Sequence, residues 1–255
     1  MHILVTNDDG VFAPGLLALA QALRALGKVS VLAPDRNWSA SGHVKTLHRP
    51  LRVKEVKLAD DSPAQASDGA PSDCVALALM GLVETPVDLV VSGINPYANL
   101  GYDMTYSGTV TAAMEAVIAG VPALAVSVDG SEEHPVSDYG PAARTTCKIA
   151  EVVMAHGGLP ANVLLNVNVP ALPEDAIRGW SITRQGTRIY RDQLLKRADP
   201  RGRPYYWIGG QAPTGVPEDG TDIGELAAGL VSITPVSLDL TAAGLITEMA
   251  GWIKK

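Results

Sequence analysis

The segment His2-Ile3-Leu4-Val5-Thr6-Asn7-Asp8-Asp9-Gly10 decides the fold, because an apolar run of strand length ends in two consecutive acids. Residues 2–6 predict a buried β-strand. A helical pattern follows: Pro14 suits the first turn of a helix, apolar residues recur with helical spacing, and Gly27 ends the pattern. Residues 29–33 then predict a second strand. Strand, helix and strand in this order form the repeating unit of a parallel sheet.

The same alternation continues through the first two thirds of the chain, and another strand and helix follow near the C-terminus. The predicted strands lie at residues 2–6, 29–33, 51–58, 87–92, 122–128, 163–169 and 230–234. The predicted helices lie at residues 14–26, 71–83, 108–119, 139–156 and 242–253. This order predicts an α/β fold with a mostly parallel sheet flanked by helices.

Length and composition indicate one large domain. The chain has 255 residues, which suits a single domain over residues 1–255 with an appendage. Hydrophobic residues make up 47% and aromatic residues 5%, so the core is expected to be aliphatic. From about residue 177 to residue 210 the pattern changes to short β-like pieces, and we expect an appended region at about 177–240.

Net charge and cysteine content indicate which classes of partner and which cellular compartment to expect. The formal net charge is −7 at pH 7, which argues against nucleic-acid binding as the role of the whole surface. Cys74 and Cys147 form no CxxC or Cys/His cluster, which predicts reduced thiols and a cytoplasmic location. The first residues lack a basic leader, and no charge-free apolar run reaches 18 residues, so neither a signal peptide nor a membrane span is expected.

A basic segment interrupts this acidic chain. Residues 184–203 hold seven basic residues against two acids, and Tyr190, Tyr205, Tyr206 and Trp207 lie in or beside the segment. Three interpretations are open: an arm that binds nucleic acid, an arm that binds a second subunit, and a solvated hairpin without a partner.

The two acids after the first strand are the sharpest candidates for chemistry. In an open α/β sheet, ligands bind beyond the carboxyl ends of the strands, which is where Asp8 and Asp9 are predicted. Both carboxylates reach one ligand only if the chain turns, and Gly10 permits a turn. Adjacent carboxylates repel unless a proton or a cation neutralises them, and hard oxygen ligands suit Mg²⁺ or Mn²⁺. The alternative is that both acids merely cap the helix near Pro14.

Two later loops add oxygen atoms at the same predicted edge. Residues 35–46 contain hydroxyls, amides and one histidine; a serine oxygen there could complete a metal shell. Residues 92–101 follow a predicted buried strand and supply neutral amide oxygens. A lone serine or histidine in a loop is more often structural than catalytic, so each is weak evidence by itself.

The segment Tyr106-Ser107-Gly108-Thr109-Val110 opens a predicted helix of small residues. Free N–H groups and the positive end of the helix dipole suit a phosphate, and the alternative is ordinary Ser/Thr capping. The chain lacks a Walker A ending and a GxGxxG after the first strand, which argues against ATP-motor and NAD-binding classes. Taken together, the three loops and this helix start predict a divalent metal that holds a phosphate.

An ordered set of motifs resembles the SurE survival protein family, whose members are metal-dependent 5′/3′-nucleotidases, and the likeness covers nearly the whole chain. Each motif is weak alone, whereas the ordered set is highly specific. The motifs are Asn7-Asp8-Asp9-Gly10; Ala33-Pro34-Asp35-Arg36 with Ser39, Gly42-His43 and Thr46; Pro71-Ser72-Asp73-Cys74-Val75; Ser92-Gly93-Ile94-Asn95 with Asn99 and Gly101; Tyr106-Ser107-Gly108-Thr109-Val110; Asn166-Val167-Asn168-Val169-Pro170; and Thr221-Asp222 with Val231-Ser232-Ile233-Thr234-Pro235.

The resemblance implies a Rossmann-like α/β domain with a protruding β-hairpin arm and a C-terminal segment used in oligomerisation, in a homodimer or homotetramer. It implies one divalent metal ion per subunit, Mg, Mn or Co, and places it at Asp8, Asp9, Ser39 and Asn95. It places the phosphate or substrate at Asn99, Ser107, Gly108 and Thr109. One departure is Tyr97, because the family often has glycine two residues after the ligand asparagine; the change affects the substrate-facing loop and hence base preference.

The function implied is hydrolysis of nucleoside 5′- and 3′-monophosphates to nucleoside and phosphate. Asp8 and His43 are the catalytic candidates, with either water or the Asp8 carboxylate as nucleophile and His43 as a donor to the leaving group or to the phosphate. The alternatives are an exopolyphosphatase or other phosphoesterase, with the basic segment guiding a polyanion, and a non-catalytic nucleotide-binding module with a structural metal. No membrane partner is expected.

Overall fold

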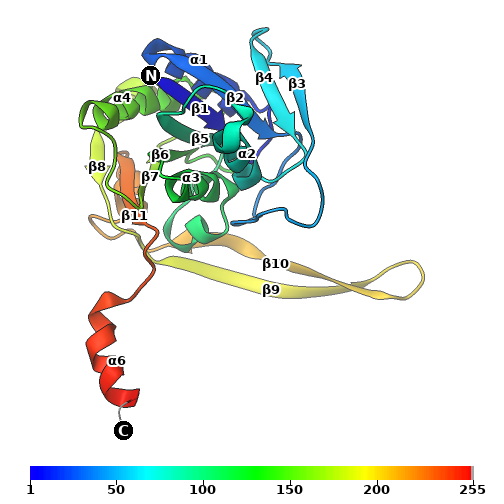
Figure 1. Cartoon of the computed structure of the whole chain (residues 1–255). Helices are drawn as coiled ribbons and strands as arrows, with labels where there is room; N and C mark the ends of the chain where they lie inside the picture. Colours follow the sequence, from blue (N-terminus) through cyan, green and yellow to red (C-terminus); the bar gives the residue numbers. More distant parts are fainter. Residues whose placement is uncertain (254–255) are drawn as a thin grey trace.

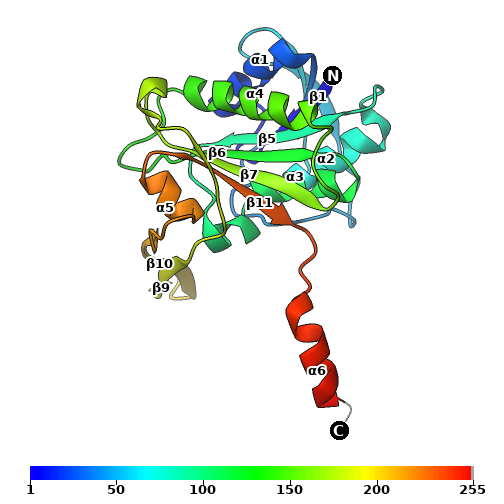
Figure 2. The ribbon, with the colours of Figure 1, turned by 90° about the vertical axis from the view of Figure 1, so that its left-hand side faces the viewer.

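The computed structural model describes residues 1–253 of the chain. A central sheet carries helices on both faces, and a long hairpin and the C-terminal helix extend away from it (Figures 1 and 2). The strands are β1 (His2–Thr6), β2 (Lys28–Pro34), β3 (Val53–Lys57), β4 (Pro63–Ser67), β5 (Leu89–Asn95), β6 (Ala123–Val128), β7 (Val163–Val169), β8 (Trp180–Ile182), β9 (Arg188–Ala198), β10 (Pro204–Gly215) and β11 (Val231–Ser237). The α-helices are α1 (Pro14–Leu23), α2 (Pro71–Leu77), α3 (Gly108–Ile118), α4 (Gly140–Ala155), α5 (Asp222–Ala227) and α6 (Ile246–Ile253).

The order of strands in the main sheet places a ligand crevice at β1 and β5. Among the described residues the sheet has nine strands in the order β3-β4-β2-β1-β5-β6-β7-β11-β8. Neighbours from β4 to β7 run parallel, which confirms the predicted mostly parallel sheet. The chain proceeds outward from β1 to β2 and later adds β5 on the other side of β1. The strand order therefore reverses between β1 and β5, and sheets of this kind bind ligands beyond the carboxyl ends at that point.

A layer of buried apolar side chains lies on each face of the sheet, between the sheet and the helices that cover it. α1 and α4 cover one face, and α2 and α3 cover the other (Figure 2). Along β1, Ile3 and Val5 pack into the layer that contains Leu16 of α1, whereas Leu4 packs into the layer that contains Val110 of α3. Because both faces of β1 are buried, its sequence is a continuous apolar run instead of an alternating one.

Some elements differ from their predicted positions. β4 was not predicted, since Pro63–Ser67 contains no β-branched or aromatic residue, and it forms because β2 and β3 pair with it from both sides. α2 ends at Leu77, and a π-helical segment, Ala78–Leu82, continues it almost to the predicted helix end at residue 83; Gly81 in this segment has a φ of +115°. The short helix α5 was also not predicted.

The region at about 177–240 is divided between the main sheet and the projecting hairpin. β11 pairs antiparallel with β7 and parallel with β8, so both strands belong to the sheet. β9 and β10 pair with each other and form a hairpin that extends well beyond the sheet (Figure 1). α6 stands apart at the end of the chain, with Ile246, Met249 and Trp252 exposed (Figure 2). None of the helices within residues 1–253 is long and apolar enough to cross a membrane.

Candidate active site

Three loops meet at the carboxyl edge of the sheet. β1 lies between β2 and β5, and all three strands run parallel, so the loops that follow them leave from the same edge. The predicted convergence of the loops is therefore observed. They carry Asp8 and Asp9 after β1, Ser39 and His43 after β2, and Asn95 at the end of β5.

A tight turn places the two acids at this edge. The Asn7 side chain donates from Nδ2 to the Gly10 carbonyl oxygen (3.0 Å), and its Oδ1 accepts from the Gly10 N–H (3.2 Å). Gly10 has a φ of +107°, and an added Cβ would lie 3.3 Å from the carbonyl carbon of Arg36. The turn that both carboxylates require is thus present, and glycine at position 10 makes it accessible.

The N-terminus of α3 fixes the Asp8 carboxylate. Thr109 donates to it twice, from its N–H to Oδ2 (3.0 Å) and from Oγ1 to Oδ1 (2.6 Å). Gly108 allows this approach, because an added Cβ would lie 2.7 Å from the Asp8 Cβ. Ser107 caps the helix by accepting from the Val110 N–H (3.2 Å). The anion site expected at this helix start is therefore filled, in part, by a carboxylate of the protein itself.

Both acids are shifted towards the protonated form. Burial raises the pKa of Asp8, although the hydrogen bonds from Thr109 act in the opposite direction. Burial, and after it the negative charge of Asp8, raises the pKa of Asp9 to about 7. When both carboxylates are ionised, their negative charge is not fully compensated by the surroundings, and a bound cation would compensate it.

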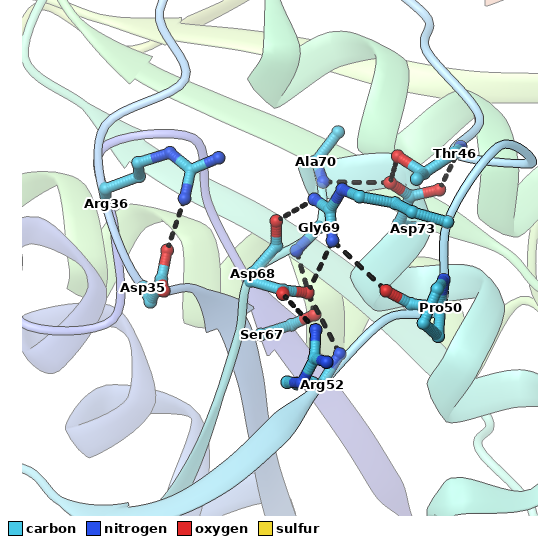
Figure 3. Close-up of polar contacts among 11 residues, drawn as sticks. Asp35, Arg36, Thr46, Pro50, Arg52, Ser67, Asp68, Gly69, Ala70 and Asp73 are labelled. Atoms are coloured by element: carbon cyan, nitrogen blue, oxygen red, sulfur yellow. Dashed lines mark hydrogen bonds and ion pairs between the residues drawn. The ribbon is translucent and has the colours of Figure 1, made fainter.

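The loop after β2 is tied to the first loop at one end and to α2 at the other. The Trp38 N–H donates to the Asp8 carbonyl oxygen (2.7 Å), so the residue before Ser39 is fixed to the backbone of the first acid. At the far end, Thr46 donates from its N–H and Oγ1 to the Asp73 carboxylate (2.8 and 2.6 Å; Figure 3). These contacts fix the loop on both sides of the exposed Ser39.

His43 contacts α3 and forms no hydrogen bond to either acid among the described residues. Its Nε2 lies 3.0 Å from Glu115 Oε2, and Lys45 Nζ donates to Glu115 Oε1 (2.9 Å). Glu115 lies six residues after Thr109 in α3, about 9 Å along the helix axis. With Nε2 engaged by Glu115, Nδ1 is the ring nitrogen that remains for a substrate.

Asn95 and Asn99 have different surroundings. The Asn95 Nδ2 donates to the Tyr97 carbonyl oxygen (2.5 Å), so Oδ1 is the atom that can face a cation. Asn99 is buried and donates from Nδ2 to Ser127 Oγ (2.8 Å), while two asparagine side chains of β7 hold its backbone. Asn99 therefore fixes the loop after β5 to β6 and β7.

Two buried acids, to which the sequence pattern gave no role, support the site. Asp73 is 2% exposed and accepts from Thr46 and from the Ala70 N–H (2.9 Å). Glu115 is 6% exposed and pairs with His43 and Lys45. A signal for Glu115 was available, because it is an acid in a predicted helix of otherwise small and apolar residues.

The residues at the crevice fit a divalent cation. Two carboxylates, a hydroxyl and an amide oxygen form a set of hard ligands, which Mg²⁺ and Mn²⁺ prefer. Nowhere in residues 1–253 do three His, Cys, Asp or Glu side chains come together, so a cation here would depend on the neutral oxygens and on water or substrate. The four residues in question are Asp8, Asp9, Ser39 and Asn95.

Comparisons with known proteins show the family of the chain. The family model described as survival protein SurE matches residues 3–192. The chain is 57% identical to "5′-nucleotidase SurE" of Herpetosiphon aurantiacus over 242 residues, which cover 94% of both chains. It is 50% identical to "5′-nucleotidase SurE" of Chloroflexus aggregans, with 99% of both chains covered. The crystal structure of the SurE protein from Aquifex aeolicus matches 100% of both chains with a TM-score of 0.83 and 40% identity. The chain belongs to the survival protein SurE family.

Proposed function

We propose that this protein is a divalent-metal-dependent phosphomonoesterase that hydrolyses nucleoside 5′- and 3′-monophosphates to nucleoside and phosphate. The observation that carries the proposal is the pair of Asp8 and Asp9 at the point where the strand order reverses, with the N-terminus of α3 against Asp8. The names of the two relatives above, both 5′-nucleotidases, support the same activity for this chain.

One Mg, Mn or Co ion per subunit would be held by Asp8, Asp9, Ser39 and Asn95. When bound, such an ion acts as a Lewis acid on a phosphoryl oxygen and offsets charge in the transition state. The chain prepares this site in advance: Thr109 keeps Asp8 in place, and the Tyr97 carbonyl oxygen orients the Asn95 amide.

The phosphate in this proposal lies at the start of α3. The Ser107 Oγ already accepts from the Val110 N–H, so its own proton can be donated to a phosphoryl oxygen. Asn99 contributes by fixing the loop between β5 and α3 to β6 and β7. The residues proposed to surround the phosphate are Ser107, Gly108 and Thr109, whereas Asn99, which was predicted at the phosphate, is proposed to support it through the loop.

Water is the nucleophile that the contacts of Asp8 favour. Both carboxylate oxygens accept hydrogen bonds from Thr109, which hinders rotation of either oxygen towards the phosphorus. His43 then protonates the leaving alkoxide from Nδ1, while Glu115 holds Nε2. Rapid quenching with phosphorus-labelled AMP is expected to trap no labelled protein, and a labelled aspartyl phosphate would assign the attack to Asp8 instead.

A substrate panel with metal titration tests the proposal. The chelated protein receives Mg²⁺, Mn²⁺ or Co²⁺ in turn, and phosphate release is measured with nucleoside 5′- and 3′-monophosphates and with polyphosphate. Metal-dependent release from the monophosphates is expected. Tight nucleotide binding without turnover for every metal would favour a non-catalytic nucleotide-binding module.

A second candidate activity, hydrolysis of polyphosphate, is favoured by the basic hairpin. Residues 184–203 carry seven basic side chains, of which Arg191, Lys196 and Arg197 lie on β9 and Arg201 and Arg203 at the turn of the projecting hairpin. The other two are paired with acids, Arg184 with Glu218 and Arg188 with Asp103. If the hairpin guides a polyanion, turnover of long chains should fall steeply with salt, whereas turnover of monophosphates should not. Equal salt dependence for both substrates would reject this role.

We also propose that the protein is a single domain over residues 1–255 that assembles into a homodimer or homotetramer in the cytoplasm. Exposed apolar side chains on the hairpin and on α6 support assembly, since they have no cover within one subunit: Leu194, Trp207, Ile208, Ile246, Met249 and Trp252. The unbridged thiols of Cys74 and Cys147 support the location.

A further inference from the structure

A cavity of about 750 Å³ opens at the amino ends of the parallel strands, at the opposite edge of the sheet from the acid pair. Its walls come from the start of β2, from β3 and β4, and from residues 82–85, which precede β5. The pairing of β2 with β4 begins only at Leu32 and Gln65, so the first residues of β2 border the cavity instead of a neighbouring strand. The volume falls in the range of small-molecule sites, and none of the loops around Asp8 contributes to the walls.

Ser30 lines this cavity, and a buried histidine lies against its hydroxyl. The Nε2 of His2, which is 4% exposed, lies 2.9 Å from the Oγ of the half-buried Ser30. On the other side of the ring, Nδ1 lies 3.0 Å from the Pro86 carbonyl oxygen and 3.2 Å from the Thr85 carbonyl oxygen. Carbonyl oxygens only accept hydrogen bonds, so the proton of the neutral ring lies on Nδ1. Nε2 is therefore the acceptor, and the Ser30 hydroxyl donates to it.

The backbone of His2 is fixed by contacts that do not use the imidazole. Its N–H donates to Asp88 Oδ2 (2.7 Å), and its carbonyl oxygen accepts from the Asp88 N–H (2.8 Å). A hydroxyl, an imidazole that accepts from it and a fixed acceptor behind the ring are the parts of an activated serine nucleophile. Here the carbonyl oxygens of Thr85 and Pro86 take the place of the usual orienting carboxylate.

The walls of the cavity favour a small ester without net charge. Lys28 lies on the same face of β2 as Ser30, because alternate residues of a strand share a face. Its Nζ donates to Thr85 Oγ1 (2.9 Å) and keeps further protons for a developing oxyanion. Two lysines and two acids line the cavity beside apolar side chains, and this balance of charge disfavours a polyanion such as a nucleotide. The lining residues concerned are Lys28, Lys57, Glu55, Glu84, Val56, Leu82 and Val83.

We propose that Ser30 and His2 form a second catalytic pair, which hydrolyses small carboxylic esters. The Ser30 Oγ attacks the carbonyl carbon while its proton moves to His2 Nε2, and the alkoxide then leaves as an alcohol with that proton. Water attacks the acyl-serine, gives one proton to Nε2, and releases the carboxylic acid as the proton returns to Ser30 Oγ. This activity goes beyond the proposed nucleotidase function and uses no residue of the crevice at Asp8.

Hydrolysis of p-nitrophenyl acetate by wild-type protein in chelator tests the proposal. We expect a burst of about one equivalent of p-nitrophenol per subunit, followed by slower turnover, because the acyl-enzyme accumulates. Mass spectrometry of the quenched protein should place the acetyl group on Ser30. An unmodified Ser30, or acetylation confined to lysines, would overturn the proposal, and this result does not depend on the folding of a variant.

Two variants and a matched control separate the pair from the rest of the surface. Ser30→Ala should abolish the burst and leave metal-dependent phosphate release from AMP unchanged, whereas His2→Gln should slow acylation at least about 10²-fold. His156→Gln is the control, because the exposed His156 also has its Nδ1 beside a backbone carbonyl oxygen (Val152, 2.8 Å) but contacts no serine within residues 1–253. A folded Ser30→Ala or His2→Gln protein that is acylated at the wild-type rate would overturn the proposal. Absence of nucleotidase activity would not affect it, since the ester assay is run without metal.

Discussion

At the residue scale, the ionised Asp9 carboxylate lowers the stability of the folded protein. Its pKa is raised from 3.8 to about 7, so between these values the unfolded chain loses its proton before the folded chain does. The metal-free protein should therefore lose stability as the pH rises from about 4 to about 7, and the loss should persist above 7. A salt-bridged aspartate has the opposite effect, because it makes the folded protein more stable as the pH rises.

Asp9→Asn should remove this penalty. In chelator at pH 8 we expect the free energy of unfolding to rise by about 2 kcal/mol. This is roughly half of the free energy that corresponds to the whole shift of the Asp9 pKa, because water screens a partly exposed carboxylate. At pH 4 the variant and the wild-type protein should be equally stable. Urea unfolding at both pH values measures the difference, and a variant that is no more stable than wild type at pH 8 would contradict this view of the acid pair.

Gly108 sets the distance between α3 and Asp8. An added Cβ would lie 2.7 Å from the Asp8 Cβ and 3.0 Å from its Oδ2, so Gly108→Ala must displace the carboxylate or the helix start. We expect at least about a tenfold rise in the metal concentration for half-maximal activity, since a displaced ligand loses roughly 1.4 kcal/mol or more of binding. Gly244→Ala, where an added Cβ meets nothing within 4 Å, is the control. Equal metal titrations for the two variants would contradict the prediction.

Some site residues could be found from the sequence and others could not. Asp8, Asp9 and Gly10 follow a recognisable strand directly, so local pattern is sufficient to place them at the sheet edge. Glu115 pairs with a histidine 72 positions earlier, and such a contact depends on how the loop after β2 packs on α3. The same packing directs His43 towards Glu115, which no local pattern indicates.

At the scale of elements, the loop after β2 depends on α2 for its position. Thr46→Val keeps the shape of the side chain but removes the hydrogen bond to Asp73, which is 2.6 Å long and partly buried. We expect a loss of about 1–2 kcal/mol in stability and weaker metal activation, because the loop carries Ser39. Thr85→Val removes an exposed hydroxyl at the opposite edge and should change neither quantity. Thermal unfolding and metal titration measure both effects; a Thr46→Val protein that matches wild type would show that the anchor is dispensable.

Elements with a strong local sequence pattern were predicted, whereas a strand that forms only because neighbouring strands pair with it was not. β1, β5 and β7 each contain an apolar run that favours a buried strand. β4 has the sequence Pro-Ala-Gln-Ala-Ser, and tertiary pairing with β2 and β3 overrides its weak propensity. An appended region was expected from short β-like pieces, and a protruding hairpin from the family resemblance; the two strands of the hairpin are longer than those pieces indicated.

At the scale of the whole molecule, the hairpin presents an apolar surface that one subunit does not cover. Ile208 is 85% exposed and Trp207 64% exposed on β10. Burial of such side chains between subunits would contribute about 1.5–3 kcal/mol each. Trp207→Glu with Ile208→Glu should therefore lower the mass measured by sedimentation, and Arg201→Glu near the turn should not. An unchanged mass for the double variant, or a monomeric wild-type protein, would reject the hairpin as an interface.

The most direct test of the central claim is phosphate release from AMP by wild-type and Asp8→Asn protein, each stripped with chelator and then supplied with Mg²⁺ or Mn²⁺. We expect wild-type protein to be inactive after stripping and to recover with metal, whereas folded Asp8→Asn protein should stay at least about 10²-fold slower at every metal concentration. Phosphate release that survives stripping, or full activity in Asp8→Asn, would contradict it.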